Sequence, residues 1–373
     1  MPSSRRVFDG SVLFGMQANE AAELLAAAVH TDIVDIQDRI LSSIHESFPL
    51  NWIPQFVYQS LVNELVQLGP AVTFAMQMIA ADASLAYPRF LGMHKRNPGS
   101  FTESTTSDIA RSAPAIFSDV EFDEDEEKEQ EDSLFLFLPL SSSDLLFIFA
   151  TALFANQTPI AIWNGMVASR ASALRNRLNA VLGQLAAISD QLPQARAALI
   201  RESKLMIAGE AGLKPSRESV AVASQLVTKT TTLAVLNQVA KKVASNAGVD
   251  LMVWSAILDD KTCLRCFNLN GKSYAIVNGE VRGPQVPLHF LCRCIYVPDF
   301  GVPTEESSAP KRNIDLSFGE WFKTLPRTVQ LRILGRDRLA LYLSGKLTLR
   351  SFVEFRNKVP IRVKQLNELR SAV

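Results

Sequence analysis

Four cysteines and one histidine, gathered in a single short stretch, constrain this chain more than any other feature. The chain has 373 residues, yet all four cysteines lie within 32 of them. Their order is C-x2-C, then 22 intervening residues, then H-x2-C-x-C. Clustered thiols favour a metal site over disulfides that staple distant segments. The five candidate ligands are Cys263, Cys266, His289, Cys292 and Cys294.

The spacing of these residues fits zinc. A Cys-x-x-Cys pair on a tight turn aims two sulfurs, about 4 Å apart, at one point, as two corners of a zinc tetrahedron require. A closed structural zinc site takes four ligands, so four of the five residues are expected to bind and one is spare. Cys292 and Cys294 are two residues apart and share a face on a strand. That geometry does not settle which of the five is left out.

A bound metal would also help the cysteine-containing segment to fold. The segment from Trp254 to Pro298 is turn-rich and β-prone, with few large apolar side chains, so we expect no sufficient core of its own. Bound metal would supply folding free energy there. A disulfide and free thiols remain the alternatives. Five candidate ligands favour a closed site over a catalytic one, and no hydrolase or phosphate-loop motif is present. We therefore expect no catalytic residues and no enzymatic activity.

The remaining sequence predicts a mainly α protein, with helical N-terminal and central regions, a small β-containing zinc-knuckle-like module and a helical C-terminal tail. Gly248 stands where a helix C-terminal cap belongs. The expected parts are an N-terminal helical region (1–94), a Ser/Thr-rich and acidic linker or loop (95–133), a central helical region (134–248), the metal-binding module (249–300) and a basic helical tail (301–373).

Two stretches bear on partners. Residues 119–132 hold ten acidic residues against one lysine, a composition that does not order itself by apolar burial. Residues 134–155 are apolar, but Pro139 and Asp144 divide them into pieces too short for the roughly 20 residues that span a bilayer. We read this tract as two buried elements and expect no membrane span.

The order of residues around the cysteines resembles the phage head morphogenesis family, the Mu F-like minor head proteins. The matching features are Trp254, then Asp with Thr-Cys-x-x-Cys at 259–266, then Leu-x-Gly at 269–271, then Pro-x-His-x-x-Cys-Arg-Cys at 287–294. Upstream, residues 212–248 are similar to the helical stretch before that module, with a Thr-rich turn followed by Asn237. Downstream, residues 321–345 resemble the closing segment of the family. The resemblance covers about residues 205–370.

This resemblance implies a structural minor head protein of a tailed phage, acting in capsid assembly at the portal vertex or the inner head surface. The implied partners are the portal and capsid proteins, with packaged DNA as a further candidate. Multiple copies are expected in the particle, and the expected location is the virion, with the host cytoplasm during assembly. The first 200 residues or so lie outside the resemblance.

The C-terminal tail offers a second functional class. Lys plus Arg equals Asp plus Glu over the whole chain, 38 each, but residues 332–370 hold ten basic residues against three acidic ones. Such an excess is suited to phosphates or to an acidic protein surface. The alternative function is therefore a nucleic-acid-binding protein that uses the metal knuckle and the basic tail. The candidate partner-binding residues are Arg350, Arg356, Lys358, Arg362 and Lys364.

Overall fold

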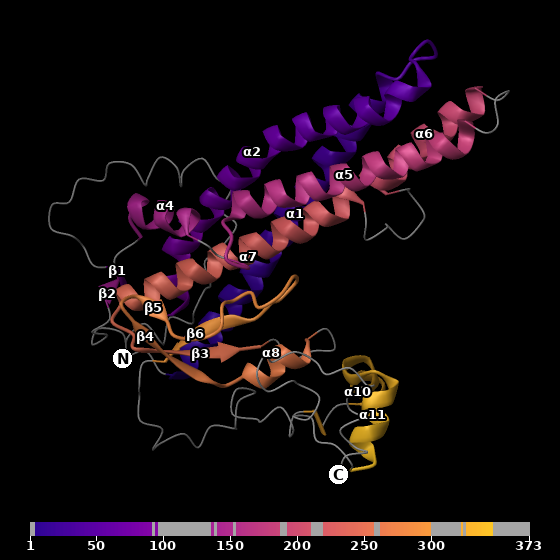
Figure 1. Ribbon diagram of the computed structural model, residues 1–373. Coiled ribbons are helices and arrows are strands. Elements are labelled where there is room, and N and C mark those ends of the chain that lie inside the picture. The colour runs from indigo at the N-terminus through magenta and orange to yellow at the C-terminus, as the bar shows by residue number, and fades with distance from the viewer. Residues whose placement is uncertain are drawn as a thin grey trace.

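The computed structural model describes residues 4–91, 94–95, 136–137, 140–151, 154–186, 192–209, 219–256, 262–299, 322–323 and 326–345. Its long helices lie side by side in one elongated bundle (Figure 1). They are α1 (Ser4–Ser42), α2 (Ile53–Phe90), α5 (Pro159–Ala186) and α7 (Val220–Asn246). The shorter helix α6 (Leu192–Ile207) follows α5, and the 3-10 turn η1 (Leu50–Trp52) joins α1 to α2.

The bundle forms because apolar residues recur at helical spacing on each helix. On α1, Ile33, Ile36 and Ile40 are buried, and on α2, Leu61 and Leu65 are fully buried. Each such side chain contributes about 1.5–3 kcal/mol when it is taken out of water. Residues of α1, α2, α5, α6 and α7 belong to one continuous core. The N-terminal and central helical regions are thus packed into the same body.

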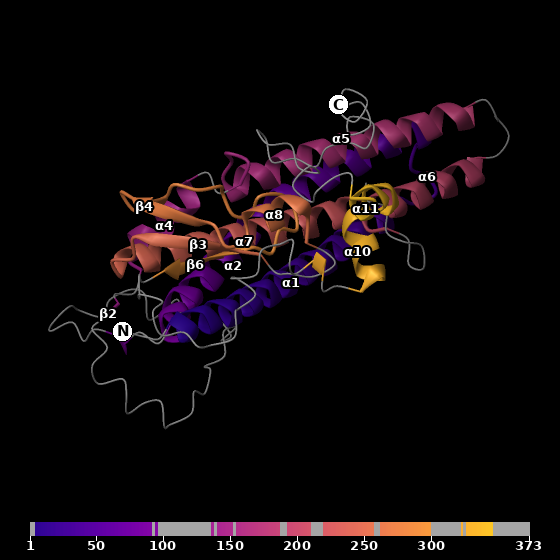
Figure 2. The ribbon, with the colours of Figure 1, turned by 90° about the horizontal axis from the view of Figure 1, so that it is seen from below.

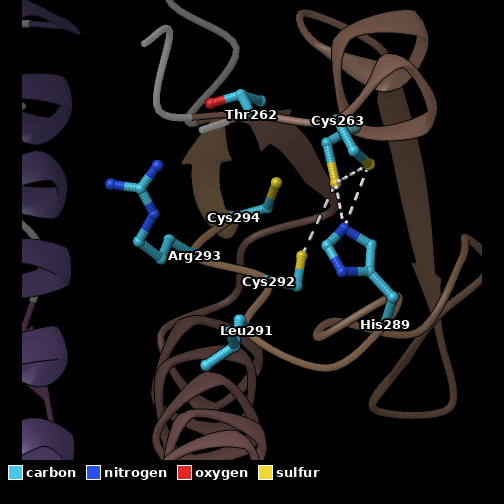
Figure 3. A pocket seen from close by; sticks show the side chains of 8 residues that line it. Thr262, Cys263, His289, Leu291, Cys292, Arg293 and Cys294 are labelled. Carbon is cyan, nitrogen blue, oxygen red and sulfur yellow. Dashed lines mark hydrogen bonds between the residues drawn. The ribbon is translucent and has the colours of Figure 1, made fainter. Parts of the chain in front are cut away.

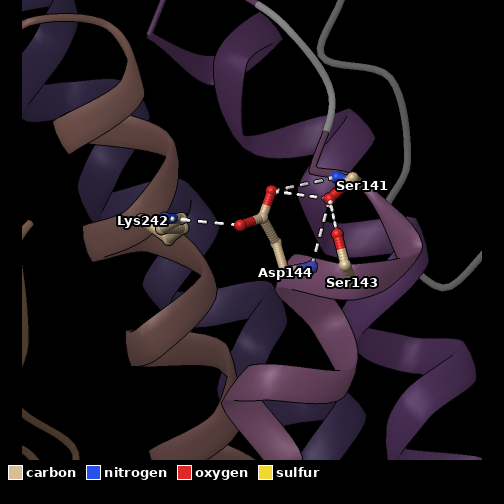
Figure 4. A network of polar contacts seen from close by, with 4 residues as sticks. All are labelled: Ser141, Ser143, Asp144 and Lys242. Carbon is tan, nitrogen blue, oxygen red and sulfur yellow. Dashed lines mark hydrogen bonds and ion pairs between the residues drawn. The ribbon is translucent and has the colours of Figure 1, made fainter.

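Helix α4 (Ser142–Ala150) docks on this bundle through an ordered start (Figure 4). Ser141 Oγ accepts a hydrogen bond from the Asp144 N–H at 3.1 Å, and the Ser141 N–H donates to Asp144 Oδ2 at 3.2 Å. Burial raises the pKa of Asp144, but the hydrogen bonds from Ser141 and Lys242 outweigh burial and lower it. Lys242 of α7 lies 3.3 Å from Asp144 Oδ1 and ties α4 to α7.

The apolar tract at 134–155 is only partly buried where it is described. It contains β2 (Leu136–Phe137), which pairs in parallel with β1 (His94–Lys95), and then α4. Helix α4 buries Ile148 and Phe149 but exposes Leu146 and Phe147, each to 63%. The expectation of two buried elements is therefore wrong for one face of α4, because a short helix on a bundle surface can bury only one side. Among the described helices, none has the length and apolarity needed to cross a membrane.

A four-stranded antiparallel sheet lies against one end of the bundle, below α7 in Figure 1, and Figure 2 shows it from below. Its order is β5 (Glu280–Val281), β4 (Ser273–Val277), β3 (Leu251–Ser255) and β6 (Ile295–Asp299). The short helix α8 (Leu264–Leu269) connects β3 to β4. The fold class is confirmed: the protein is mainly α, with a small β-containing module.

The module has a small hydrophobic core, which the thiols of Cys266, Cys292 and Cys294 share. Trp254 and Tyr296 are opposite each other on β3 and β6, and their rings meet edge to face with centroids 5.4 Å apart. Met252, Leu269 and Val286 are fully buried around them. The sequence hides this core because its members are spread over some 45 residues and meet only when the strands pair.

The segment between α7 and β3 is a tight helix end, as predicted at Gly248. Gly248 has φ +78, and the Val249 N–H donates to the Ala244 carbonyl at 3.1 Å, so the chain leaves the helix and enters β3 within a few residues. Ala244 of α7 belongs to the core of the module. Helix α7 therefore contributes side chains both to the bundle core and to the module core.

The described part of the C-terminal region consists of α10 (Arg327–Leu334) and α11 (Arg336–Leu343). The rings of Phe322 and Tyr342 meet edge to face at 5.4 Å, and Gln330 Nε2 donates to the Phe322 carbonyl at 2.9 Å. Helix at 327–343 agrees with the predicted helical tail, whose residues 301–321 lie outside the described residues. The acidic stretch at 119–132 and the tail beyond residue 345 lie outside the described residues.

Candidate metal centre

The first two ligands come from the start of α8. Cys263 is the N-cap residue of this helix, and Cys266 lies in its first turn, where the Phe267 N–H donates to the Cys263 carbonyl at 3.1 Å. The helical turn places both thiols on one side, with the sulfur atoms 3.5 Å apart. This is the arrangement that the C-x2-C spacing predicted.

The next ligands come from a tight turn before β6. The Cys292 N–H donates to the His289 carbonyl at 3.1 Å, which folds the chain back so that both side chains face α8. Leu291, inside this turn, has φ +61, a left-handed conformation that costs a leucine about 1–2 kcal/mol. Cys294 follows at the entrance to β6.

The side chains from these two segments converge (Figure 3). His289 Nε2 lies 3.0 Å from Cys263 Sγ and 3.3 Å from Cys266 Sγ. Cys292 Sγ lies 3.6 Å from Cys266 Sγ. Together with the 3.5 Å between Cys263 and Cys266, these distances define a compact cluster of three sulfurs and one nitrogen.

All five predicted ligands take part in this convergence, in two overlapping groups. Cys263, Cys266 and His289 form one group, and Cys266, Cys292 and Cys294 form the other. Within each group the ligand atoms lie within 4.8 Å of one another. Cys266 belongs to both groups, so it is the central ligand. Either group could hold a metal ion.

The separations suit a tetrahedral ion. Two sulfurs at about 2.3 Å from a zinc ion are about 3.8 Å apart across a tetrahedron. The distances from Cys266 Sγ to Cys263 Sγ and to Cys292 Sγ, 3.5 and 3.6 Å, are close to that value. They are far longer than the roughly 2.05 Å of a disulfide bond, and none of the four cysteines is oxidised to one.

His289 is held in the tautomer that a metal requires. Its Nδ1 lies 2.7 Å from the carbonyl oxygen of Phe290, and because a carbonyl only accepts, Nδ1 must carry the proton. Once zinc displaces the second ring proton, Nε2 presents its lone pair toward Cys263 and Cys266. A backbone carbonyl bound to the other ring nitrogen is the usual support for a metal-ligating histidine.

The thiols perturb one another strongly. The hydrogen bond with Cys266, followed by that with His289, holds the pKa of Cys263 at about 4 against the effect of burial. Hydrogen bonds with Cys266 and Cys294 lower the pKa of Cys292 to about 2. The pKa of Cys266 is raised, first by Cys263, because a further anion beside thiolates is costly. The pKa of His289 is raised to about 9 by its hydrogen bond with Cys263. A bound cation would offset the repulsion between these closely spaced thiolates.

Two residues outside the motif reach the ligand turn. The Leu291 N–H donates to Thr230 Oγ1 at 3.2 Å, and Asn237 Nδ2 donates to the Cys294 carbonyl at 3.4 Å. Both come from α7. The Thr-rich stretch that contains Thr230 is helix, not the turn expected from the sequence. The hydroxyls of Thr231 and Thr232 donate to carbonyls of their own helix, Val227 and Thr228 respectively, each at 2.8 Å, so these β-branched residues are accommodated.

The predicted partner-binding residues Arg350, Arg356, Lys358, Arg362 and Lys364 lie outside the described residues, and their role stays a prediction.

Comparison with known proteins found no match. No family model, no curated protein and no solved structure is similar to this chain at a significant level.

Proposed function

We propose that the cluster at 263–294 is a structural zinc site, and that the chain is a structural minor head protein of a tailed phage. The observation that carries the first part is the convergence of thiol and imidazole ligands from two segments more than 20 residues apart. Thiol sulfurs and an imidazole nitrogen are a soft donor set, which favours zinc over magnesium or calcium.

The ligand count supports a structural role over a catalytic one. A catalytic zinc keeps one position open for water or substrate, whereas five protein donors surround this centre. Neither ligand group contains a carboxylate that could act as a general base beside the ion. Zinc in such a closed site contributes to folding and does no chemistry on a substrate.

The ligand set that we assign is Cys263, Cys266, His289 and Cys292. Four of the separations among these ligand atoms are 3.0–3.6 Å, and His289 Nδ1 donates to a backbone carbonyl, which leaves Nε2 for the metal. Cys294 is then the spare thiol, next to Cys292 and Cys266.

Three non-ligand residues of the resembling motif support a head-protein module because they have structural tasks. Trp254 and Leu269 are fully buried in the module core. Gly271 has φ +76, and its N–H donates to the Trp254 carbonyl at 2.8 Å, which returns the chain to the sheet. A motif whose described ligand and non-ligand residues stabilise one small unit fits a protein of an assembly. We propose portal and capsid proteins as partners, in the virion and in the host cytoplasm during assembly.

Two measurements test this proposal. Elemental analysis of the purified full chain should find about one zinc per chain, lost together with thermal stability on chelation. Mass spectrometry of purified phage particles should find the chain in multiple copies, counted against the portal protein. A zinc-bearing chain absent from the particle would leave the metal site standing and contradict the head-protein assignment.

A further inference from the structure

The turn that carries the ligands does not stand alone on the module. It rests on α7, which belongs to the helical bundle. The Leu291 N–H and the Cys294 carbonyl, on either side of the ligand Cys292, are each bonded to a side chain of α7, Thr230 and Asn237 respectively. These partners are 61 and 57 residues away in sequence.

The two α7 side chains that contact the ligand turn lie on one face of the helix. Thr230 and Asn237 are seven residues apart, or about two turns, so they lie on the same face of the helix. Both are buried, Thr230 completely and Asn237 to all but 4%. Asn237 Nδ2 also donates to the Leu233 carbonyl of its own helix at 2.9 Å, which fixes the amide while its second contact is to Cys294.

The Thr230 hydroxyl has a particular task. Leu291 is held at φ +61, which L side chains rarely adopt, and the bond to Thr230 Oγ1 holds its N–H in that conformation. Without this bond the turn would gain by relaxing to negative φ. Relaxation would rotate the peptide that leads into Cys292 and move its sulfur away from Cys266.

Further contacts make this junction tight. A Cβ on Gly15 of α1 would lie 3.0 Å from Ile295 Cδ1, so α1 and β6 approach each other closely just after Cys294. The Lys241 ammonium lies 5.9 Å from the ring centroid of Tyr296, and the rings of Phe154 and Phe290 are 4.9 Å apart. The turn is thus fixed against α1 and α7 on both sides of the ligands.

We propose that Thr230 and Asn237 are positioning residues for the metal centre, and that metal loading of the module stabilises the α1–α7 part of the bundle. This inference rests on the proposed zinc site and extends it. By linkage, a helix that orders the ligand turn raises metal affinity, and the bound metal stabilises that helix packing by the same free energy.

The first test is zinc affinity of the full chain, measured by competition with a chromogenic chelator. Thr230→Val keeps the shape of the side chain and removes its acceptor, and Asn237→Leu removes the amide donor. Each should weaken zinc binding about tenfold, the lower end of the range for residues that orient ligands. Thr230→Ser keeps the hydroxyl and should restore affinity close to that of the unaltered chain.

Thr232→Val is the matched control. It is the same substitution at a buried threonine of the same helix, and the Thr232 hydroxyl donates to the Thr228 carbonyl of its own helix. It should leave zinc affinity unchanged even if it alters the melting temperature. Equal effects of Thr230→Val and Thr232→Val would overturn the positioning role, with the zinc site intact. If Thr230→Val does not fold, Asn237→Leu and Thr230→Ser give the same comparison.

The second test is hydrogen exchange of the full chain with and without zinc. Zinc should slow exchange in α7 around residues 230–244 and in α1 near Gly15, as well as in the module. Protection confined to residues 251–299 would overturn the coupling to the bundle. A chain that binds no zinc at all would remove the proposed site and this inference together, and it is recognised by the chelator measurement alone.

Discussion

The sulfur atoms of Cys266 and Cys292, 26 residues apart in the sequence, lie 3.6 Å from each other. This distance is too long for a disulfide bond. It is close to the separation between two sulfur ligands of a tetrahedral zinc ion. Because Cys266 is also the residue shared by both ligand groups, it links the C-x2-C turn to the H-x2-C turn. The consequences of losing each thiol should therefore differ.

Cys266→Ser and Cys263→Ser should abolish stoichiometric zinc binding and unfold the module locally. Loss of the bound ion should lower the melting temperature by about 5–10 °C at micromolar zinc. Cys294→Ser is the matched control. It should retain zinc and lower the melting temperature less, because Cys294 is the thiol that does not bind the ion. The measurement is zinc content together with thermal unfolding. Retention of zinc by Cys266→Ser, or its loss only in Cys294→Ser, would contradict the assigned ligand set.

Metal affinity should rise with pH between about 6 and 9. The unloaded centre holds protons that zinc must displace: one on Cys266, whose pKa is raised, and one on His289, whose pKa is about 9. Cys263 and Cys292, with pKa values of about 4 and 2, are already ionised at neutral pH. Binding at pH 7 should therefore release about two protons, measurable by calorimetry in buffers of different ionisation enthalpy. A pH-independent affinity would count against these protonation states.

The zinc affinity of variants at position 291 should depend more on how well the new residue adopts a positive φ than on the size of its side chain. Leu291 is 53% exposed, so Leu291→Gly loses little apolar burial and removes the left-handed penalty. We expect this variant to bind zinc at least as tightly as the unaltered chain. Leu291→Val should weaken binding, because β-branched residues tolerate positive φ least. Chelator competition gives the ranking, and tighter binding by the valine variant would refute the role of the turn.

Lys241 should destabilise the fold at neutral pH. Burial lowers its pKa to about 8, although the Glu280 carboxylate opposes the shift. Since the folded pKa is below the usual 10.5, the unfolded chain binds more protons between about pH 8 and 10.5. The contribution of Lys241 to stability is therefore least favourable below pH 8 and improves as pH rises through that window.

Lys241→Met should accordingly stabilise the zinc-loaded protein at pH 7, by on the order of 1 kcal/mol. The gain should shrink as the pH approaches 10. Lys242→Met is the control, because Lys242 pairs with Asp144 and its loss should be neutral or slightly destabilising. Denaturant unfolding at several pH values measures both. A pH-independent difference between Lys241→Met and the unaltered chain would show that desolvation is not the cause.

Local patterns in the sequence predicted the elements that depend on local physics. Helical spacing located α1 and α2, Gly248 marked the end of α7, and the C-x2-C and H-x2-C spacings predicted that five side chains converge. Contacts between distant segments escaped prediction. The Trp254–Tyr296 pair forms only when β3 and β6 align, and the bond from Leu291 to Thr230 joins residues 61 positions apart. No periodicity signals that a threonine within a helix supports a metal turn.

X-ray absorption at the zinc edge, on the purified full chain, tests the central claim most directly. The account predicts one zinc ion per chain, with three sulfur neighbours at about 2.3 Å and one nitrogen at about 2.0 Å. Cys294→Ser should leave that spectrum unchanged. A chain that holds no zinc, or a coordination shell of oxygen and nitrogen without sulfur, would contradict the account.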